Sequence, residues 1–371
     1  MKESVVSLNL RKQVDDCKPY IAGETEASVL KRYGLNKVVK LGSNENPFGP
    51  YKHAKKAMQE SLEVVNRYPE DDYVELTATI AKINNLDVTN IALGSGAGNV
   101  IETVARLLLD EGDEVLIAKP TYRLYREVSI LMGATIREIP VKSDFTYDLE
   151  AMEEDITDKT KLIWLCNPNN PTGVINDRKE LESFIDRVGD DVWIVLDEAY
   201  ADFIAGGQRP EIVELLKNKK LIVIRTFSKF YGMAGVRVGY LMAQAAVISA
   251  FDTITEPFCV NRTGLFAAKA TLLADQEQAD RIKNLILDER ARMESALNEM
   301  GFTVIPSSSN FIFAKLPNDL YSATICEQLM AKGVIIRECD AWGYPAYVRI
   351  TIGKKEENDF LLNKLADVIE N

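Results

Sequence analysis

VWIVLDEAY at residues 192–200 and LIVIRTFSKF at residues 221–230 decide the fold class, because each begins with a short apolar run that ends in polar side chains. Short runs rich in Val, Ile and Leu, without polar alternation, are typical of parallel strands covered on both faces. Such strands are predicted at Ile91 to Leu93, Val115 to Ala118, Leu162 to Cys166, Val192 to Leu196, Leu221 to Ile224 and Val238 to Met242. Amphipathic helices are predicted between several of them, so the sequence indicates an open α/β sheet.

The last third of the chain has a different pattern. A long charged helix is predicted from Ala274 to Met300, and a final helix over residues 354–369. Short strands are predicted at Phe302 to Ile305, Asn310 to Ala314, Val334 to Arg337 and Tyr347 to Ile352. We therefore expect an N-terminal arm over residues 1–40 that packs with the small domain, a large domain over 41–265, and a small α+β domain over 266–371.

Composition excludes several classes of protein. The 371 residues are 46% hydrophobic and 27% charged, which excludes disorder, collagen and small disulfide scaffolds. The net charge of -12 argues against a nucleic-acid partner. The sequence has no apolar run of the roughly 18 residues that a membrane helix needs, so no membrane partner is expected. Its five scattered cysteines indicate reduced thiols and a cytoplasmic location.

A single histidine, His53, limits the chemistry that the chain can perform. It precedes an amphipathic helix and is expected to be an exposed residue near the start of that helix. Ser-His-Asp triads and histidine-rich metal sites need histidines that the chain lacks, and no metal site is predicted. Proton transfer must therefore depend mainly on Lys, Tyr, Asp, Glu or Cys.

Two of the predicted strands end in loops suited to binding a ligand, since open parallel sheets bind ligands beyond the carboxyl ends of their strands. GSGAGN at residues 94–99 is a glycine-rich turn that opens a helix, which suits a phosphate, although an ordinary tight turn has the same pattern. A dinucleotide site is less favoured because the glycine spacing fails at Asn99. NPNNPTG at residues 167–173 is either an ordinary turn or a rigid loop that orients Asn170.

Two further strands end in charged residues. Asp197 follows an apolar run, and a buried carboxylate needs a cationic partner, either a structural arginine or a ligand. Lys229 lies between aromatic residues, where desolvation would lower the pKa of its amine and make it a nucleophile. Thr226, Ser228 and Arg237 could serve one phosphate. The alternative is a surface lysine beside a structural arginine.

Together, these segments call for one ligand with four properties. It carries a phosphate and an aldehyde that forms an imine with Lys229. It also has a ring nitrogen opposite Asp197 and a ring oxygen that accepts hydrogen bonds from Asn170 and Tyr200. Pyridoxal 5'-phosphate has all four properties, and the carboxylate of Asp197 would keep its ring nitrogen protonated, so that the ring withdraws electrons from the substrate.

NPNNPTG, LDEAY and TFSKFYGMAGVRVGY resemble the aspartate-aminotransferase fold family of pyridoxal-phosphate enzymes, fold type I. The resemblance implies a large domain that binds the cofactor on a central, mostly parallel sheet, and a smaller α+β domain. Within this family the chain is most similar to the histidinol-phosphate aminotransferases. The segments that carry this likeness are KPYIAGE at 18–24, VVKLGSNENPFGP at 38–50, RYPEDDY at 67–73, KPTYRLY at 119–125, EPFCVNR at 256–262 and YVRITIG at 347–353.

The resemblance implies a role for each matching residue. Lys229 would be the Schiff-base lysine and the proton shuttle, Asp197 the partner of the ring nitrogen, and Asn170 and Tyr200 the partners of the ring oxygen. Tyr122 would stack on the ring. The phosphate would be surrounded by Gly96, Ala97, Thr226, Ser228 and Arg237.

The resemblance also implies a homodimer with shared sites, because Tyr68 would reach the phosphate of the neighbouring subunit. Arg349 would bind the anionic group of the substrate, with Arg337 and Tyr20 as second candidates. The chain departs from the usual pattern at Gly98-Asn99, where an acidic pair is common, and at Phe230, where a smaller residue is common.

The predicted activity is transfer of an amino group between the small molecules L-histidinol phosphate and 2-oxoglutarate. An aromatic amino-acid aminotransferase is the nearest alternative, with Arg349 binding an α-carboxylate. A decarboxylase or β-lyase would keep the cofactor and break a different bond. A non-catalytic cofactor-binding or nucleotide-binding protein remains the alternative from another class.

Overall fold

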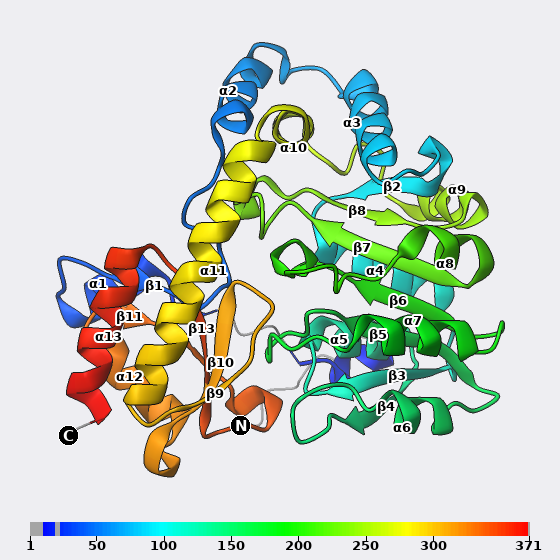
Figure 1. Ribbon diagram of the computed structural model, residues 1–371. Helices are drawn as coiled ribbons and strands as arrows, with labels where there is room; N and C mark the ends of the chain where they lie inside the picture. Colours follow the sequence, from blue (N-terminus) through cyan, green and yellow to red (C-terminus); the bar gives the residue numbers. More distant parts are fainter. Residues whose placement is uncertain (1–9, 19–22, 370–371) are drawn as a thin grey trace, which may run out of the picture.

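The computed structural model describes residues 10–18 and 23–369 and divides into two sheet-based regions that lie side by side (Figure 1). The larger region contains a seven-stranded sheet in the order β2-β8-β7-β6-β5-β3-β4. Its strands are β2 (Ile91–Gly94), β3 (Glu114–Lys119), β4 (Thr135–Pro140), β5 (Thr160–Cys166), β6 (Trp193–Asp197), β7 (Leu221–Thr226) and β8 (Gly239–Met242). The sheet is mixed and mostly parallel, as the sequence predicts.

Helices cover both faces of this sheet, which is why its strands are apolar on both sides. In β5, Leu162 and Trp164 pack on one face, and Ile163 and Leu165 on the other. One face is covered by α4 (Ala97–Leu108), α5 (Arg123–Leu131) and α9 (Ala245–Ile254). The other is covered by α3 (Glu70–Ile83), α6 (Leu149–Glu154), α7 (Arg178–Arg187), α8 (Ile212–Asn218) and α10 (Arg262–Ala274).

The smaller region has a core of its own around an antiparallel sheet in the order β12-β13-β10-β9. These strands are β9 (Thr303–Ile305), β10 (Phe311–Lys315), β12 (Arg337–Glu338) and β13 (Tyr347–Thr351). A separate pair joins β1 (Val39–Lys40) to β11 (Val334–Ile335). The remaining helices are α1 (Glu26–Tyr33), α2 (Lys52–Ser61), α11 (Gln276–Glu299), α12 (Ser322–Ala331) and α13 (Lys355–Ile369).

Several details differ from the sequence-based expectations. Strand β8 is antiparallel to both of its neighbours, although its apolar run is the same as that of a parallel strand. Strand β4 was not predicted, because TIREIP lies at the sheet edge and carries charged residues. The expected strand over residues 334–337 is divided between two sheets. The long charged helix is α11, which ends at Glu299.

Two segments of the chain lie where the regions adjoin. Arg11 donates a hydrogen bond to the carbonyl of Leu131 in α5, so residues 10–18 lie against the larger region, while β1 joins the smaller one. Leu265 and Leu272 of α10 belong to the core of the larger region, and Ala279 to that of the smaller one. The change of core therefore falls between Leu272 and Ala279. In the described part of the chain, every helix is too short or too polar to cross a bilayer.

Candidate active site

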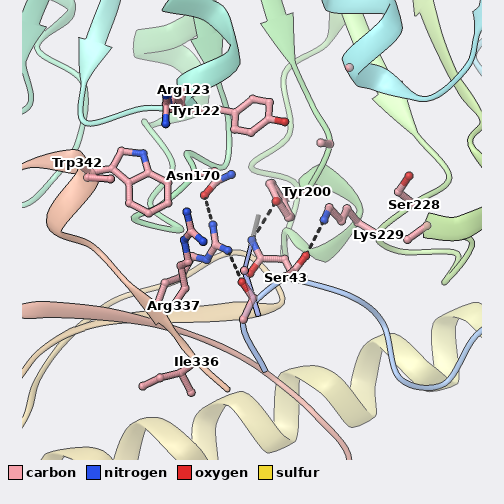
Figure 2. Close-up of a pocket in the computed structure, with 18 of the residues that line it drawn as sticks. Ser43, Tyr122, Arg123, Asn170, Tyr200, Ser228, Lys229, Ile336, Arg337 and Trp342 are labelled. Atoms are coloured by element: carbon pink, nitrogen blue, oxygen red, sulfur yellow. Dashed lines mark hydrogen bonds between the residues drawn. The ribbon is translucent and has the colours of Figure 1, made fainter. Parts of the chain in front are cut away.

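A cavity of about 500 Å³ lies between the two regions, beyond the carboxyl ends of β5, β6 and β7 (Figure 2). Its volume is in the usual range for a small-molecule site. Predicted site residues that line it are Ala97, Tyr122, Asn170, Asp197, Tyr200, Thr226, Ser228, Lys229, Arg237, Arg337 and Arg349. Residues far apart in the sequence therefore meet in one place, since each follows a strand of the same sheet or comes from the smaller region.

Lys229 follows β7 and extends its side chain into the cavity (Figure 2). Its Nζ donates a hydrogen bond to the carbonyl of Ser43 at 3.0 Å and lies 5.7 Å from the centre of the Tyr200 ring. Burial, followed by the positive charge of Arg349, lowers the pKa of Lys229 to about 8. At neutral pH about a tenth of such an amine is uncharged, which makes it available as a nucleophile or base.

The lowered pKa predicts how Lys229 reacts in the protein without a ligand. Only the uncharged amine reacts, so acetylation of Lys229 should increase as pH rises from 7 and level off above about 9, because the pKa of this amine is about 8. Mass spectrometry of the Lys229 peptide at several pH values measures this. An unstructured lysine peptide in the same tube is the control and should keep gaining reactivity beyond pH 10. Parallel profiles for the two amines would contradict the prediction.

Asp197, the last residue of β6, is 3% exposed and is held by neutral donors. The hydroxyl of Tyr125 donates to its Oδ2 at 2.6 Å, and the amide of Ala199 donates to its Oδ1 at 2.9 Å. Burial raises the pKa of Asp197, while these hydrogen bonds and the charge of Lys229 oppose the rise. A cationic ring nitrogen in the cavity would stabilise the charged form of this carboxylate.

The neighbouring Glu198 has the opposite environment. It is 1% exposed and forms ion pairs with Arg225 at 2.7 Å and Arg209 at 3.0 Å. The structural arginines that sequence reasoning considered for Asp197 therefore bind Glu198 instead. Successive side chains of an extended segment point in opposite directions, which explains why only Asp197 lines the cavity.

The glycine-rich turn and the segment after β7 form a basic, donor-rich end of the cavity. Ala97 begins α4, where free backbone N–H groups and the helix dipole favour an anion. Arg237 donates to the hydroxyl of Ser228 at 3.3 Å, and its guanidinium lies directly against Gly96. Gly96 has φ +81° and could not carry a Cβ atom without clashing with Arg237. Gly96 therefore packs against the Arg237 guanidinium and is not among the residues that line the cavity.

The opposite wall carries two arginines from the smaller region. Arg349 is 6% exposed and donates to Oδ1 of Asn170 at 2.6 Å and to the carbonyl of Gly42 at 2.7 Å. With the oxygen of Asn170 engaged in this way, its amide nitrogen is the remaining donor. Arg337 faces Arg349 across strands β12 and β13. The hydroxyl of Tyr200 accepts a hydrogen bond from Asn44 at 3.0 Å.

One predicted site residue, Tyr68, lies elsewhere. Tyr68 is 74% exposed, stacks on Phe258 with ring centres 4.8 Å apart, and is absent from the lining of this cavity. Tyr20 lies outside the described residues. His53 is partly exposed in the first turn of α2, as expected, and its Nδ1 is 2.7 Å from Asp275.

The structure also reveals residues for which the sequence analysis proposed no role. Ser43 and Asn44, the partners of Lys229 and Tyr200, lie in the quoted segment LGSNENP. Tyr125 lies in the quoted segment KPTYRLY. Trp342, whose indole lines the cavity, precedes a strand in a segment with no recognisable signal.

Comparison with known proteins gives the family of this chain. The sequence profile of aminotransferase class I and II matches residues 36–365. The chain belongs to this aminotransferase family. It is 36% identical to a histidinol-phosphate aminotransferase of Caldicellulosiruptor saccharolyticus over 360 residues, covering 97% of this chain and 99% of that one. A protein of the same name from Bacillus subtilis is 36% identical over 369 residues, covering 98% and 100%.

Solved structures agree with this assignment. Histidinol-phosphate aminotransferase from Sinorhizobium meliloti, solved in complex with pyridoxal-5'-phosphate, superposes with a TM-score of 0.91 at 26% identity, covering 99% of both chains. Aspartate aminotransferase from Thermotoga maritima has a TM-score of 0.83 at 22% identity, covering 98% and 100%, a likeness of fold alone. The aminotransferase therefore has the aspartate-aminotransferase-like fold predicted from its motifs.

The residues of the cavity fit the cofactor of the family. A phosphate suits the helix start at Ala97 beside Arg237, and a cationic ring nitrogen suits the buried Asp197, which accepts hydrogen bonds from two neutral donors, the Tyr125 hydroxyl and the Ala199 amide. Lys229, with its lowered pKa, lines the same cavity as both. One molecule of pyridoxal phosphate could use all three features together.

Proposed function

We propose that this aminotransferase moves the amino group of L-histidinol phosphate to 2-oxoglutarate, a step of histidine biosynthesis, with pyridoxal phosphate as its cofactor. The observation that carries the proposal is the 36% identity, over nearly the whole chain, to relatives named for this reaction. The cross-strand neighbours Arg337 and Arg349 support it. Their forked guanidinium groups can donate hydrogen bonds to a phosphate in one half-reaction and to carboxylates in the other.

The cofactor would be held by residues from the larger region. In this proposal Asp197 pairs with the ring nitrogen, Asn170 and Tyr200 donate to the ring oxygen, and Tyr122 stacks on the ring. The residues around the phosphate would be Gly96, Ala97, Thr226, Ser228 and Arg237. Bound pyridoxal phosphate supplies an aldehyde that captures the substrate's amine and a ring that withdraws electrons from the α-carbon.

Lys229 would carry the proton transfer. Its Nζ, largely deprotonated above pH 8, accepts the proton of the substrate's α-carbon and later returns it. The carbonyl of Ser43, 3.0 Å from this Nζ, keeps the amine in the cavity between these two events. Arg337 and Arg349 meanwhile hold the substrate's anionic end at the opposite wall, which fixes the α-carbon relative to Lys229.

A panel of amine donors assayed with 2-oxoglutarate tests the proposed substrate. We expect kcat/KM for L-histidinol phosphate to exceed that for L-phenylalanine by at least about 100-fold, because a site built for a phosphate discriminates strongly against a donor that lacks one. Preference for phenylalanine would instead make the protein an aromatic amino-acid aminotransferase. Turnover of the donor without any oxoacid would indicate a decarboxylase or β-lyase.

We further propose that the protein is a homodimer with shared active sites. Tyr68 and Phe258 stack on one another and are both exposed, so they form an apolar patch of the kind that is typical of interfaces. The ring of Tyr68 stacks on Phe258, and Tyr68 is not among the residues that line the cavity of its own chain. A second copy of the chain is the occupant that would bury this patch and receive Tyr68.

Mixed dimers test the role of Tyr68. A Tyr68→Ala chain and a Lys229→Ala chain should each have little activity alone, because each lacks one group of every site. After mixing and exchange of subunits, about a quarter of all sites would combine Lys229 of one chain with Tyr68 of the other, so activity should return towards that fraction of wild type. Assays before and after exchange measure this. Failure to recover, with heterodimers shown to form, would contradict shared sites.

We also propose a cytoplasmic location. All five cysteines are free, and two of them, Cys326 and Cys339, are buried in the smaller region. Unpaired thiols scattered in this way favour a reducing compartment. Fractionation of cells that express the protein at its natural level would test the location.

A further inference from the structure

Trp342 lies beside both arginines of the proposed anion site. It ends the 3-10 turn Asp340–Trp342, just before β13. The centre of its ring is 5.8 Å from Cζ of Arg337 and 5.7 Å from Cζ of Arg349. Both distances are within the range of cation–π attraction, for which tryptophan is the best aromatic partner. Figure 2 shows the indole next to Arg337 on the wall that faces Asn170.

The two arginines repel one another because they are cross-strand partners. Arg337 of β12 pairs with Arg349 of β13, so both side chains leave the sheet on the same face. Like charges directly opposite one another repel, and burial of Arg349 reduces the screening by water. The negative face of an aromatic ring close to both guanidinium groups offsets part of this repulsion before any anion binds.

The indole also connects this wall to the larger region. Its Nε1–H donates a hydrogen bond to the carbonyl of Thr121 at 2.9 Å, next to Tyr122, the residue proposed to stack on the cofactor. The hydroxyl of Thr121 in turn donates to Asn169, the neighbour of Asn170. The ring of Trp342 packs against a small core that joins Phe145 of the larger region to Phe313 of the smaller one. Trp342 is thereby fixed from both sides of the cavity.

We propose that Trp342 is a positioning residue of the substrate's anion site. Its ring holds the guanidinium groups of Arg337 and Arg349 side by side, ready for one anionic group, and its N–H fixes that pair relative to the loop at Thr121 and Tyr122. The inference rests on the proposed function only in that these two arginines bind the anion of the substrate. It adds a residue that controls affinity for that anion without touching the reacting atoms.

The test compares Trp342→Leu with Trp342→Phe in the holoenzyme. Leucine removes the aromatic face and the N–H, whereas phenylalanine keeps an aromatic face and removes only the N–H. Inorganic phosphate serves as the probe of the anion site, and its Kd is measured by calorimetry. The KM and kcat for L-histidinol phosphate are measured in parallel. Trp193→Leu is the matched control, since Trp193 starts β6 and is not among the residues that line the cavity.

We expect Trp342→Leu to weaken phosphate binding and raise the KM about tenfold, with less than a threefold change in kcat. Trp342→Phe should recover most of the affinity, and Trp193→Leu should leave it at the wild-type value. If Trp342→Leu lost kcat but kept the wild-type Kd for phosphate, Trp342 would serve only to join the two regions, and the inference would be overturned. A wild-type enzyme that binds phosphate but does not use histidinol phosphate would refute the proposed substrate and leave this inference standing.

Discussion

Replacement of Lys229 by alanine is expected to reduce turnover of the amine donor by about 10⁴-fold or more, because in the proposed mechanism this one side chain supplies both the covalent anchor and the proton shuttle. The amine of Lys229 lines the same cavity as Asp197 and Arg349. The proposed mechanism assigns the anchor and the proton shuttle to this lysine alone. The measurement is single-turnover transfer to 2-oxoglutarate. Borohydride followed by mass spectrometry should attach the cofactor covalently to Lys229 in wild type and not in the variant.

Two comparisons separate lost chemistry from a damaged fold. Lys40→Ala removes another ammonium group that lines the cavity, one that is paired with Glu45 at 3.0 Å, and should change kcat less than tenfold. Added ethylamine should partly restore turnover in Lys229→Ala, because a small amine can enter the space that the side chain leaves. Steady transamination by Lys229→Ala without any added amine would refute the role of Lys229.

The large sheet, and the gathering of the candidate site residues in one cavity, could be predicted because both depend on local patterns. Each buried strand is a run of apolar residues, and each binding residue follows such a run, so the topology of a parallel sheet brings them to one edge. The direction of β8 could not be read in this way, since a run buried on both faces has the same composition in either orientation. Strand β4 was missed because an edge strand tolerates the charges in TIREIP.

The opposite wall of the site was predicted less completely, since it depends on packing between the two regions. Arg349 and Arg337 were expected from the family resemblance, but their cross-strand pairing requires the register of β12 and β13. Trp342 acts through contacts with Thr121, more than two hundred residues away, which no local pattern encodes.

Asp197→Asn should lower activity and Glu198→Gln should lower stability, although the two carboxylates are adjacent and almost equally buried. Burial raises the pKa of Asp197, which means that its charge is unfavourable until a cation arrives in the cavity. Burial also acts on Glu198, but Arg225 and Arg209 outweigh it and lower the pKa of that residue below its ordinary value. The charge of Glu198 therefore stabilises the fold, and that of Asp197 is available to the ligand.

We accordingly expect Asp197→Asn to reduce kcat/KM by about 10³-fold, because it removes one partner of the buried charge pair that Asp197 would form with the cofactor's ring nitrogen. The same substitution should not lower the Tm of the protein without cofactor. Glu198→Gln should lose about 3 kcal/mol of unfolding free energy because it leaves two arginines without their carboxylate. Thermal unfolding of both cofactor-free variants, with kinetics of both reloaded ones, measures the contrast. A large fall in Tm for Asp197→Asn would mean that this carboxylate supports the fold, and the assignment of its charge to the cofactor ring would then be wrong.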